Sequence, residues 1–150
     1  MTSIVELTAT QTHDLRRRVL RVGTPSTELT YAQDDADGTI FLGVSHDSRI
    51  VAVSTWTPET WPGASRHQPR PAVWLRGMAV EPALQGQGFG ALLVRAGVER
   101  AWANGAEVVW ASARDTALPF YLRLGFTIDG DVFTDAATGL PHHHISLSHH

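Results

Sequence analysis

The sequence predicts an α/β fold in which helices flank a mixed, mostly antiparallel central sheet of six to seven strands. Short segments with alternating or continuous apolar residues, typical of strands, recur along the chain and are separated by turn sequences and by segments with helical spacing. A glycine-rich turn joins one such strand directly to the longest helical segment. With 150 residues, the chain suits one domain that spans residues 1–150.

The N-terminal half is predicted to contain a strand, two helices and a hairpin. Thr10 can cap a helix over residues 10–22, which Gly23 can end. We expect a shorter helix over residues 24–31 and an exposed loop over residues 33–38. Strands are predicted over residues 3–8, 40–45 and 49–57, the last two paired as an antiparallel hairpin around the turn His46-Asp47-Ser48.

The C-terminal half is predicted to alternate strands with helices and to end on two strands. Residues 57–71 hold several prolines and are expected to form a loop or flap. The longest helix is expected over residues 88–104, with Gly105 as its end, and a shorter helix over residues 116–124. Strands are predicted over residues 72–80, 108–113, 127–133 and 142–147, with a turn over residues 135–141 before the last of them.

The turn Gln85-Gly86-Gln87-Gly88-Phe89-Gly90 has the composition of a phosphate-binding loop. Its glycines allow a ligand to approach the backbone, and the positive end of the following helix dipole favours an anion. A P-loop is excluded because Ala91-Leu92 stands where Lys and Ser or Thr are required. A dinucleotide fingerprint matches only formally, because the loop lies in mid-chain and Glu107 precedes the next strand instead of ending it.

The pattern Gln/Arg-x-x-Gly-x-Gly/Ala fits Gln85, Gly88 and Gly90 without adjustment, and resembles the acyl-CoA pyrophosphate loop of the GNAT superfamily of N-acetyltransferases. Residues 113–126, with Phe120-Tyr121 on a short helix and Gly125-Phe126 after it, look like the second signature of that superfamily. The sequences Arg76-Gly77-Met78-Ala79 and Gly139-Leu140-Pro141-His142 are similar to a largely uncharacterised bacterial branch. The resemblance runs from the first strand to the last.

The resemblance implies a GNAT-like sheet and an enzyme that transfers an acetyl group from acetyl-CoA to a primary amine. It implies a bulge near the end of the central strand, where backbone N–H groups of Met78, Ala79 and Val80 bind the pantetheine arm and the thioester carbonyl. Ser112 stands where that branch often has Asn. The expected cofactor contacts are Met78, Ala79, Val80, Gln85, Gly86, Gln87, Gly88, Phe89, Gly90 and Ser112.

Tyr121 is the predicted general acid, because the pKa values of a phenol and an alkyl thiol, about 10 and 8.5, suit proton transfer to a leaving thiolate. His142 is the predicted base that takes a proton from the amine, with a water chain as the alternative. Strand alternation places His142 and His144 on one face and His143 on the other. With no cysteine to form an acyl-enzyme, the amine is expected to attack directly.

Arg76 is a candidate for binding an anionic group of the substrate, and Trp56 is a candidate for a wall of the substrate pocket. Their alternatives are an ion pair on the sheet face and core packing. The histidine-rich end of the chain could suggest a metal, but no nearby carboxylate completes a ligand set, so no metal cofactor is expected. A small-molecule amine is the expected acceptor, with a protein amine as the alternative.

Composition narrows the function further. The formal net charge is −3, and neither a basic run nor an apolar membrane span is present, so neither a nucleic acid nor a membrane is expected as a partner. No signal peptide is evident, and we expect a cytoplasmic protein. The sequence leaves open a homodimer and two rival functions: a non-catalytic acyl-CoA-binding module on the same fold, and a nucleotide-binding oxidoreductase domain.

Overall fold

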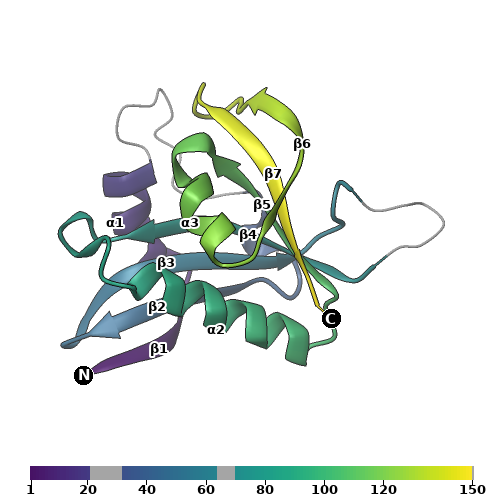
Figure 1. Cartoon of the computed structure of the whole chain (residues 1–150). Helices are drawn as coiled ribbons and strands as arrows, with labels where there is room; N and C mark the ends of the chain where they lie inside the picture. The colour runs from purple at the N-terminus through teal and green to yellow at the C-terminus, as the bar shows by residue number, and fades with distance from the viewer. Residues whose placement is uncertain (21–31, 64–69, 150) are drawn as a thin grey trace.

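A computed structural model describes residues 1–20, 32–63 and 70–149 of the chain. Seven strands form one sheet in the order β1-β2-β3-β4-β5-β7-β6 (Figure 1). All neighbours are antiparallel except β4 and β5, which are parallel, so the prediction of a mixed, mostly antiparallel sheet flanked by helices is confirmed. The strands are β1 (Thr2–Leu7), β2 (Ile40–His46), β3 (Arg49–Pro58), β4 (Ala72–Val80), β5 (Val108–Arg114), β6 (Thr127–Thr134) and β7 (Pro141–Ser148).

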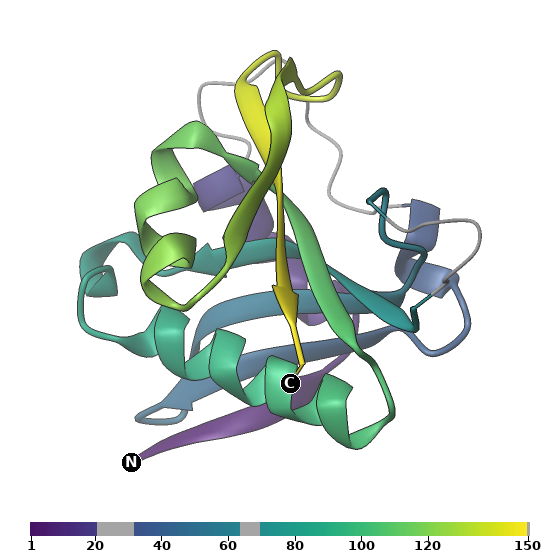
Figure 2. The same cartoon turned by 45° about the vertical axis from the view of Figure 1, so that its right-hand side comes forward.

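Helices cover both faces of the sheet (Figures 1 and 2). The long helix α2 (Phe89–Ala103) and the short helix α3 (Leu118–Arg123) share an apolar core with one face, in which Leu75, Leu93, Val109 and Ile145 are buried. The first helical segment contributes Leu15 to a smaller core on the other face. The helical turns are η1 (Thr10–Thr12), α1 (His13–Leu15), η2 (Arg16–Leu20), η3 (Ala32–Asp35), η4 (Pro82–Leu84) and η5 (Asp115–Ala117).

The predicted hairpin is formed by β2 and β3, whose turn residues Asp47 and Ser48 have φ values of 49° and 66°. Positive φ at both positions matches the twist of the flanking strands and closes a two-residue turn. The hairpin lies next to β4, the middle strand of the sheet, because β3 also pairs with β4.

The N-terminal helical region differs from the prediction of one continuous helix. It consists of a 3-10 turn, a single α-turn and a π-type turn that ends at Leu20 in the described part. Arg16 in its middle is fully buried, where it bonds to the Asp34 carboxylate and to the Thr55 hydroxyl. This polar contact, which apolar spacing does not reveal, sets the local geometry. The predicted end of this helix and the predicted helix over residues 24–31 lie outside the described residues.

The prediction of an exposed loop over residues 33–38 is wrong for Asp34. This residue lies in the turn η3, and its side chain is fully buried between Arg16 and Arg76. Burial is tolerated because the guanidinium groups of Arg16 and Arg76 both donate to the carboxylate. Residues 35–38 are exposed as expected.

The strands β4 and β5 separate soon after they meet. They pair only over Ala72–Trp74 and Val108–Trp110, although β4 continues to Val80 and β5 to Arg114. On its other edge β4 carries a bulge, since Thr55 pairs with Arg76 but Val53 pairs with Ala79. Gly77 within it has a φ of 62°, which favours glycine. The bulge spans Gly77 and Met78, so it overlaps the predicted region around Met78, Ala79 and Val80.

Helix α2 approaches the sheet closely at Gly97. A Cβ added there would overlap the indole ring of Trp56, which is 2% exposed and donates its Nε1–H to the Ser54 hydroxyl at 2.8 Å. Glycine is therefore required at this position because the helix backbone rests on the indole, and its low helix propensity is tolerated for that contact.

Gly97→Ala should destabilise the protein by roughly 1–3 kcal/mol, because overpacking outweighs the gain in helix propensity of about 1 kcal/mol. Chemical denaturation of Gly97→Ala, of Trp56→Phe and of the double variant measures this effect. Because phenylalanine has the smaller ring, Gly97→Ala should lower the free energy of unfolding less in the Trp56→Phe background than in the wild type. Equal costs of the alanine in both backgrounds would contradict the close approach.

Candidate active site

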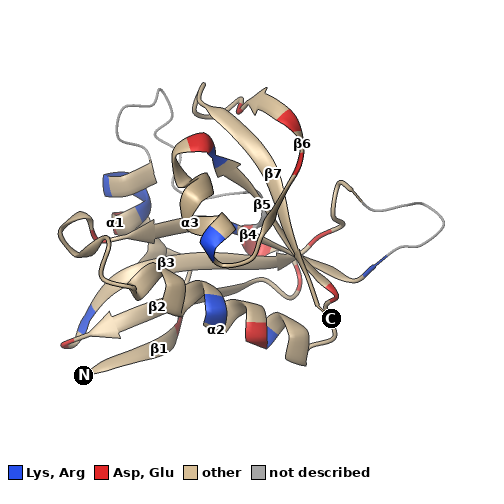
Figure 3. Ribbon diagram, in the orientation of Figure 1, with Lys and Arg blue, Asp and Glu red and all other residues tan. Residues whose placement is uncertain are grey.

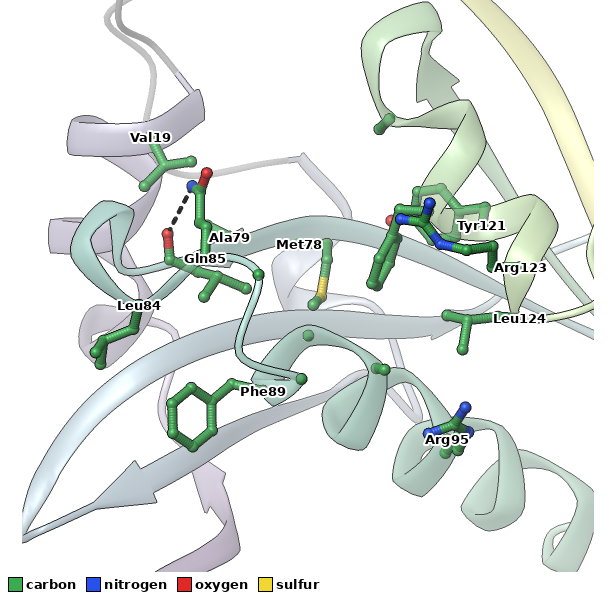
Figure 4. A pocket seen from close by; sticks show the side chains of 17 residues that line it. Val19, Met78, Ala79, Leu84, Gln85, Phe89, Arg95, Tyr121, Arg123 and Leu124 are labelled. Carbon is green, nitrogen blue, oxygen red and sulfur yellow. Dashed lines mark hydrogen bonds between the residues drawn. The ribbon is translucent and has the colours of Figure 1, made fainter.

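A cavity of about 550 Å³ opens where β4 leaves β5, on the sheet face covered by α2 and α3 (Figure 4). The end of β4, the glycine loop, and residues of α2, α3 and the η2 turn form its walls. Of the predicted site residues, it brings together Met78, Ala79, Val80, Gln85, Gly86, Gly88, Phe89, Gly90 and Tyr121. Gln87, Ser112, Arg76, Trp56 and His142 are not among its lining residues.

The glycine loop has the geometry of an anion site. Gly86 and Gly88 have φ values of 82° and 92°, and a Cβ added at either would meet no atom within 4 Å. Gly88 is the N-cap of α2 and offers no capping side chain, so the first N–H groups of the helix are left for a ligand or solvent. Gln85 closes the loop by donating its side-chain amide to the Val80 carbonyl at 3.2 Å (Figure 4).

Ion pairs anchor the strand end that leads into this loop. The Arg18 guanidinium donates to both Glu81 carboxylate oxygens at 2.8 and 2.7 Å, and also to Asp14. These hydrogen bonds hold the pKa of Glu81 below its usual range, so this carboxylate stays charged and is a poor general base. Arg18 thus fixes the helical turn η2 to the loop at the cavity's edge.

Tyr121 projects from α3 toward Met78 at the centre of the cavity (Figure 4). It is 7% exposed, and its ring packs edge-on against the rings of Phe120 and Phe126. Burial raises the pKa of Tyr121 above that of a free phenol, so the hydroxyl stays protonated through the neutral range. A raised pKa also makes it a weaker acid than the simple match of phenol and thiol predicts, and favours hydrogen-bond donation to a leaving sulfur.

The prediction that Trp56 walls the substrate pocket is wrong, because its indole is buried beneath α2. Arg76 forms an ion pair on the sheet face, which is the second of its two predicted roles. Its guanidinium bonds to Asp34 at 3.3 Å and lies 4.9 Å from the centre of the Trp74 ring. Arg76 and Trp74 lie on the sheet face opposite the cavity. Trp74 stacks there on Trp110 of β5, with ring centres 5.0 Å apart.

The three histidines that follow Pro141 on β7 alternate between the faces as predicted. The rings of His142 and His144 both contact Phe133, whereas His143 bonds through Nδ1 to Asp115 at 2.7 Å. His144 lies 3.2 Å from the Ser112 hydroxyl, which explains why Ser112 is directed away from the cavity. The carbonyl of Leu140 accepts from Nδ1 of His142 at 3.0 Å, so the neutral tautomer has its lone pair on Nε2.

His142 lies across β5 from the gap, because it pairs with Arg114 on the far edge of that strand. It is 6% exposed, and it faces away from Tyr121. A proton can therefore reach His142 from the gap only through a bridging group or water molecule. Within residues 1–20, 32–63 and 70–149, no cluster of three or more histidine or acidic side chains is arranged for a metal ion.

Sequence reasoning missed Arg95 and Arg123, which line the cavity from α2 and α3. Helical spacing could have found them. Arg95 lies four residues after Ala91, and Arg123 lies three residues after Phe120, so each shares a helix side with another lining residue. The link between His143 and Asp115 was also missed, because it joins residues far apart in the chain.

The seven-stranded, mostly antiparallel sheet with its flanking helices matches the fold of known acetyltransferases. Residues 9–126 match the acetyltransferase (GNAT) family. The chain belongs to that family, as the sequence motifs indicated.

Individual relatives agree with this assignment. The chain is 26% identical over 133 residues to "Uncharacterized N-acetyltransferase YitI" of Bacillus subtilis (strain 168), a match that covers 89% of this chain and 87% of that protein. The fold is similar to that of FeeM, an N-acyl amino acid synthase from uncultured soil microbes, with a TM-score of 0.80, 16% identity and coverage of 99% and 91%. It is also similar to that of Escherichia coli ElaA, with a TM-score of 0.75, 18% identity and coverage of 97% and 99%.

The structural likenesses, at these identities, show the shared fold alone. None of the helices in the described ranges is long and apolar enough to cross a membrane.

Proposed function

We propose that this acyltransferase moves an acetyl group from acetyl-CoA to the amine of a small molecule by direct attack. The observation that carries the proposal is the cavity itself, which joins an open glycine loop to a buried tyrosine through the gap between β4 and β5. A protein amine is the alternative acceptor. A panel of amines incubated with acetyl-CoA, with free CoA as the readout, distinguishes the acceptor classes.

The residues present fit acetyl-CoA. In the described part of the chain, the cavity is lined by two arginines and by no aspartate or glutamate, so its charge suits a phosphate-rich ligand. Its remaining walls are largely apolar, as a pantetheine arm requires. When bound, acetyl-CoA supplies the thioester whose carbonyl the amine attacks.

In this proposal the chain contributes three things to the reaction. The backbone N–H groups among Met78, Ala79 and Val80 that face the gap at the unpaired edge of β4 bind the pantetheine arm and the thioester carbonyl, on whose oxygen negative charge develops. Tyr121 donates its hydroxyl hydrogen to the sulfur that leaves. His142, which lies on the sheet face opposite the cavity, accepts the proton lost by the amine through a water molecule or a side chain that bridges the two.

The glycine loop gives the most direct test, and Gly105 supplies a matched control. Gly88 and Gly105 have φ values of 92° and 93°, and a Cβ at either meets open space, so valine strains both backbones alike. Of these two glycines, Gly88 lines the cavity and Gly105 does not. Calorimetry should show that Gly88→Val loses acetyl-CoA affinity by roughly tenfold or more, while Gly105→Val binds like the wild type.

Unchanged affinity in a folded Gly88→Val protein would rule out the loop as the pyrophosphate site. Equal losses in the two variants would assign the effect to backbone strain. Tight binding by the wild type without turnover of any amine would favour the non-catalytic acyl-CoA-binding module.

Tyr121→Phe removes only the hydroxyl and should lower kcat by roughly 10² with little change in the KM for acetyl-CoA, because the lost hydrogen bond forms mainly in the transition state. Since burial raises the pKa of Tyr121, the wild type should show no loss of kcat from tyrosine ionisation up to pH of about 10. Steady-state and single-turnover kinetics measure both effects. Near-full turnover in Tyr121→Phe, with chemistry limiting the rate, would exclude the role.

His142→Gln should remove the acidic limb of the kcat/KM profile, on which the activity of the wild type rises with pH as the base loses its proton. His149→Gln is the control, because its imidazole stacks on Trp102 at the other end of β7. His143→Gln, which changes the histidine on the opposite face of β7, should leave the acidic limb intact. A limb that survives in His142→Gln but disappears in His144→Gln would instead place the base at His144, acting through Ser112.

A further inference from the structure

The cavity contains a second group of cations besides the glycine loop. Arg95 of α2 and Arg123 at the end of α3 both line it, and both residues are exposed to solvent. Figure 3 shows blue segments, which mark Lys and Arg, on both helices. In the close view they lie on the same side of the cavity, with Leu124 between them, whereas Gln85 and Val19 lie on the opposite side (Figure 4). The cavity therefore has two separate places that favour an anion.

Neither arginine is engaged elsewhere. Within residues 1–20, 32–63 and 70–149, no ion pair or hydrogen bond joins either guanidinium to another residue, in contrast to Arg100 on the same helix, which pairs with Glu6 at 2.8 Å. Among the residues that the structure describes, no aspartate or glutamate lines the cavity to neutralise them. Two unpaired guanidinium groups beside an apolar wall are well suited to a phosphate monoester, which offers several oxygen acceptors and up to two charges.

We propose that Arg95 and Arg123 form a second anion subsite that binds the 3′-phosphate of coenzyme A. This inference rests on the proposed function, in which the glycine loop binds the pyrophosphate. A ribose joins the 3′-phosphate to that pyrophosphate, so both groups reach the same cavity in one ligand. The subsite makes the protein select thioesters of coenzyme A over phosphopantetheine thioesters carried on a protein, which lack the adenosine and its 3′-phosphate.

The test compares three probes: coenzyme A, dephospho-CoA and 4′-phosphopantetheine. Calorimetry with the wild type should show coenzyme A binding roughly tenfold or more tightly than dephospho-CoA, and this preference should shrink at high salt. Arg95→Gln and Arg123→Gln should each reduce the preference by about three- to tenfold, and the double variant should bring it close to one. The affinity for dephospho-CoA should stay within about twofold throughout.

Arg100→Gln is the matched control, since it removes a guanidinium from the same helix outside the cavity. It should leave the preference unchanged. Arg100→Gln should also leave the kcat at saturating acetyl-CoA unchanged, because Arg100 lies outside this cavity.

Several results would overturn the inference while leaving the proposed function intact. They are equal binding of coenzyme A and dephospho-CoA by the wild type, equal losses for both ligands in the arginine variants, and phosphopantetheine binding as tight as that of coenzyme A. If none of the three probes binds the wild type, the proposed function fails, and the subsite fails with it.

Discussion

The separation of β4 from β5 after three residue pairs is the constraint on which the site depends. Parallel strands would normally continue to pair and would satisfy each other's backbone groups. Here β3 pairs with β4 on both sides of the bulge, as far as Val80, and β7 pairs with β5 through seven residue pairs, so the gap is stabilised from both sides. The gap leaves the backbone groups on one edge of β4 available to a ligand, at the point where the cavity opens.

A buried ionic cluster supports the same region from the other face. Arg16 of η2 and Arg76 of β4 share the Asp34 carboxylate, and Arg16 also donates to Thr55 of β3 at 2.6 Å. Removing one member of such a cluster is costly because it leaves a buried charge without its partner. Arg114 of β5 reaches the backbone carbonyl of Leu20 at the end of η2. The helical turn η2 therefore connects the two strands that part.

Much of the fold was predictable because its signals are local. Each of these signals reflects the backbone conformation of a few neighbouring residues. They are the alternation in residues 40–45 and 49–57, the turn at Asp47-Ser48, and the glycines at the two ends of α2, Gly88 and Gly105. The glycine loop was found because its spacing identifies strand, loop and helix, and Tyr121 was found because residues 113–126 resemble the second signature of the superfamily. Contacts between distant residues were not predictable in this way. The burial of Asp34 between two arginines, the packing of Trp56 beneath Gly97 and the link from His143 to Asp115 depend on the tertiary arrangement.

The central claim is that the gap between β4 and β5 receives the thioester of acetyl-CoA. A crystal structure of the protein with acetyl-CoA tests it most directly. The account predicts the pyrophosphate on the N–H groups of the glycine loop and the thioester oxygen within hydrogen-bond distance of a backbone N–H between Met78 and Val80. Acetyl-CoA bound on the opposite face, against Trp74 and Trp110, or β4 paired with β5 along its full length, would contradict it.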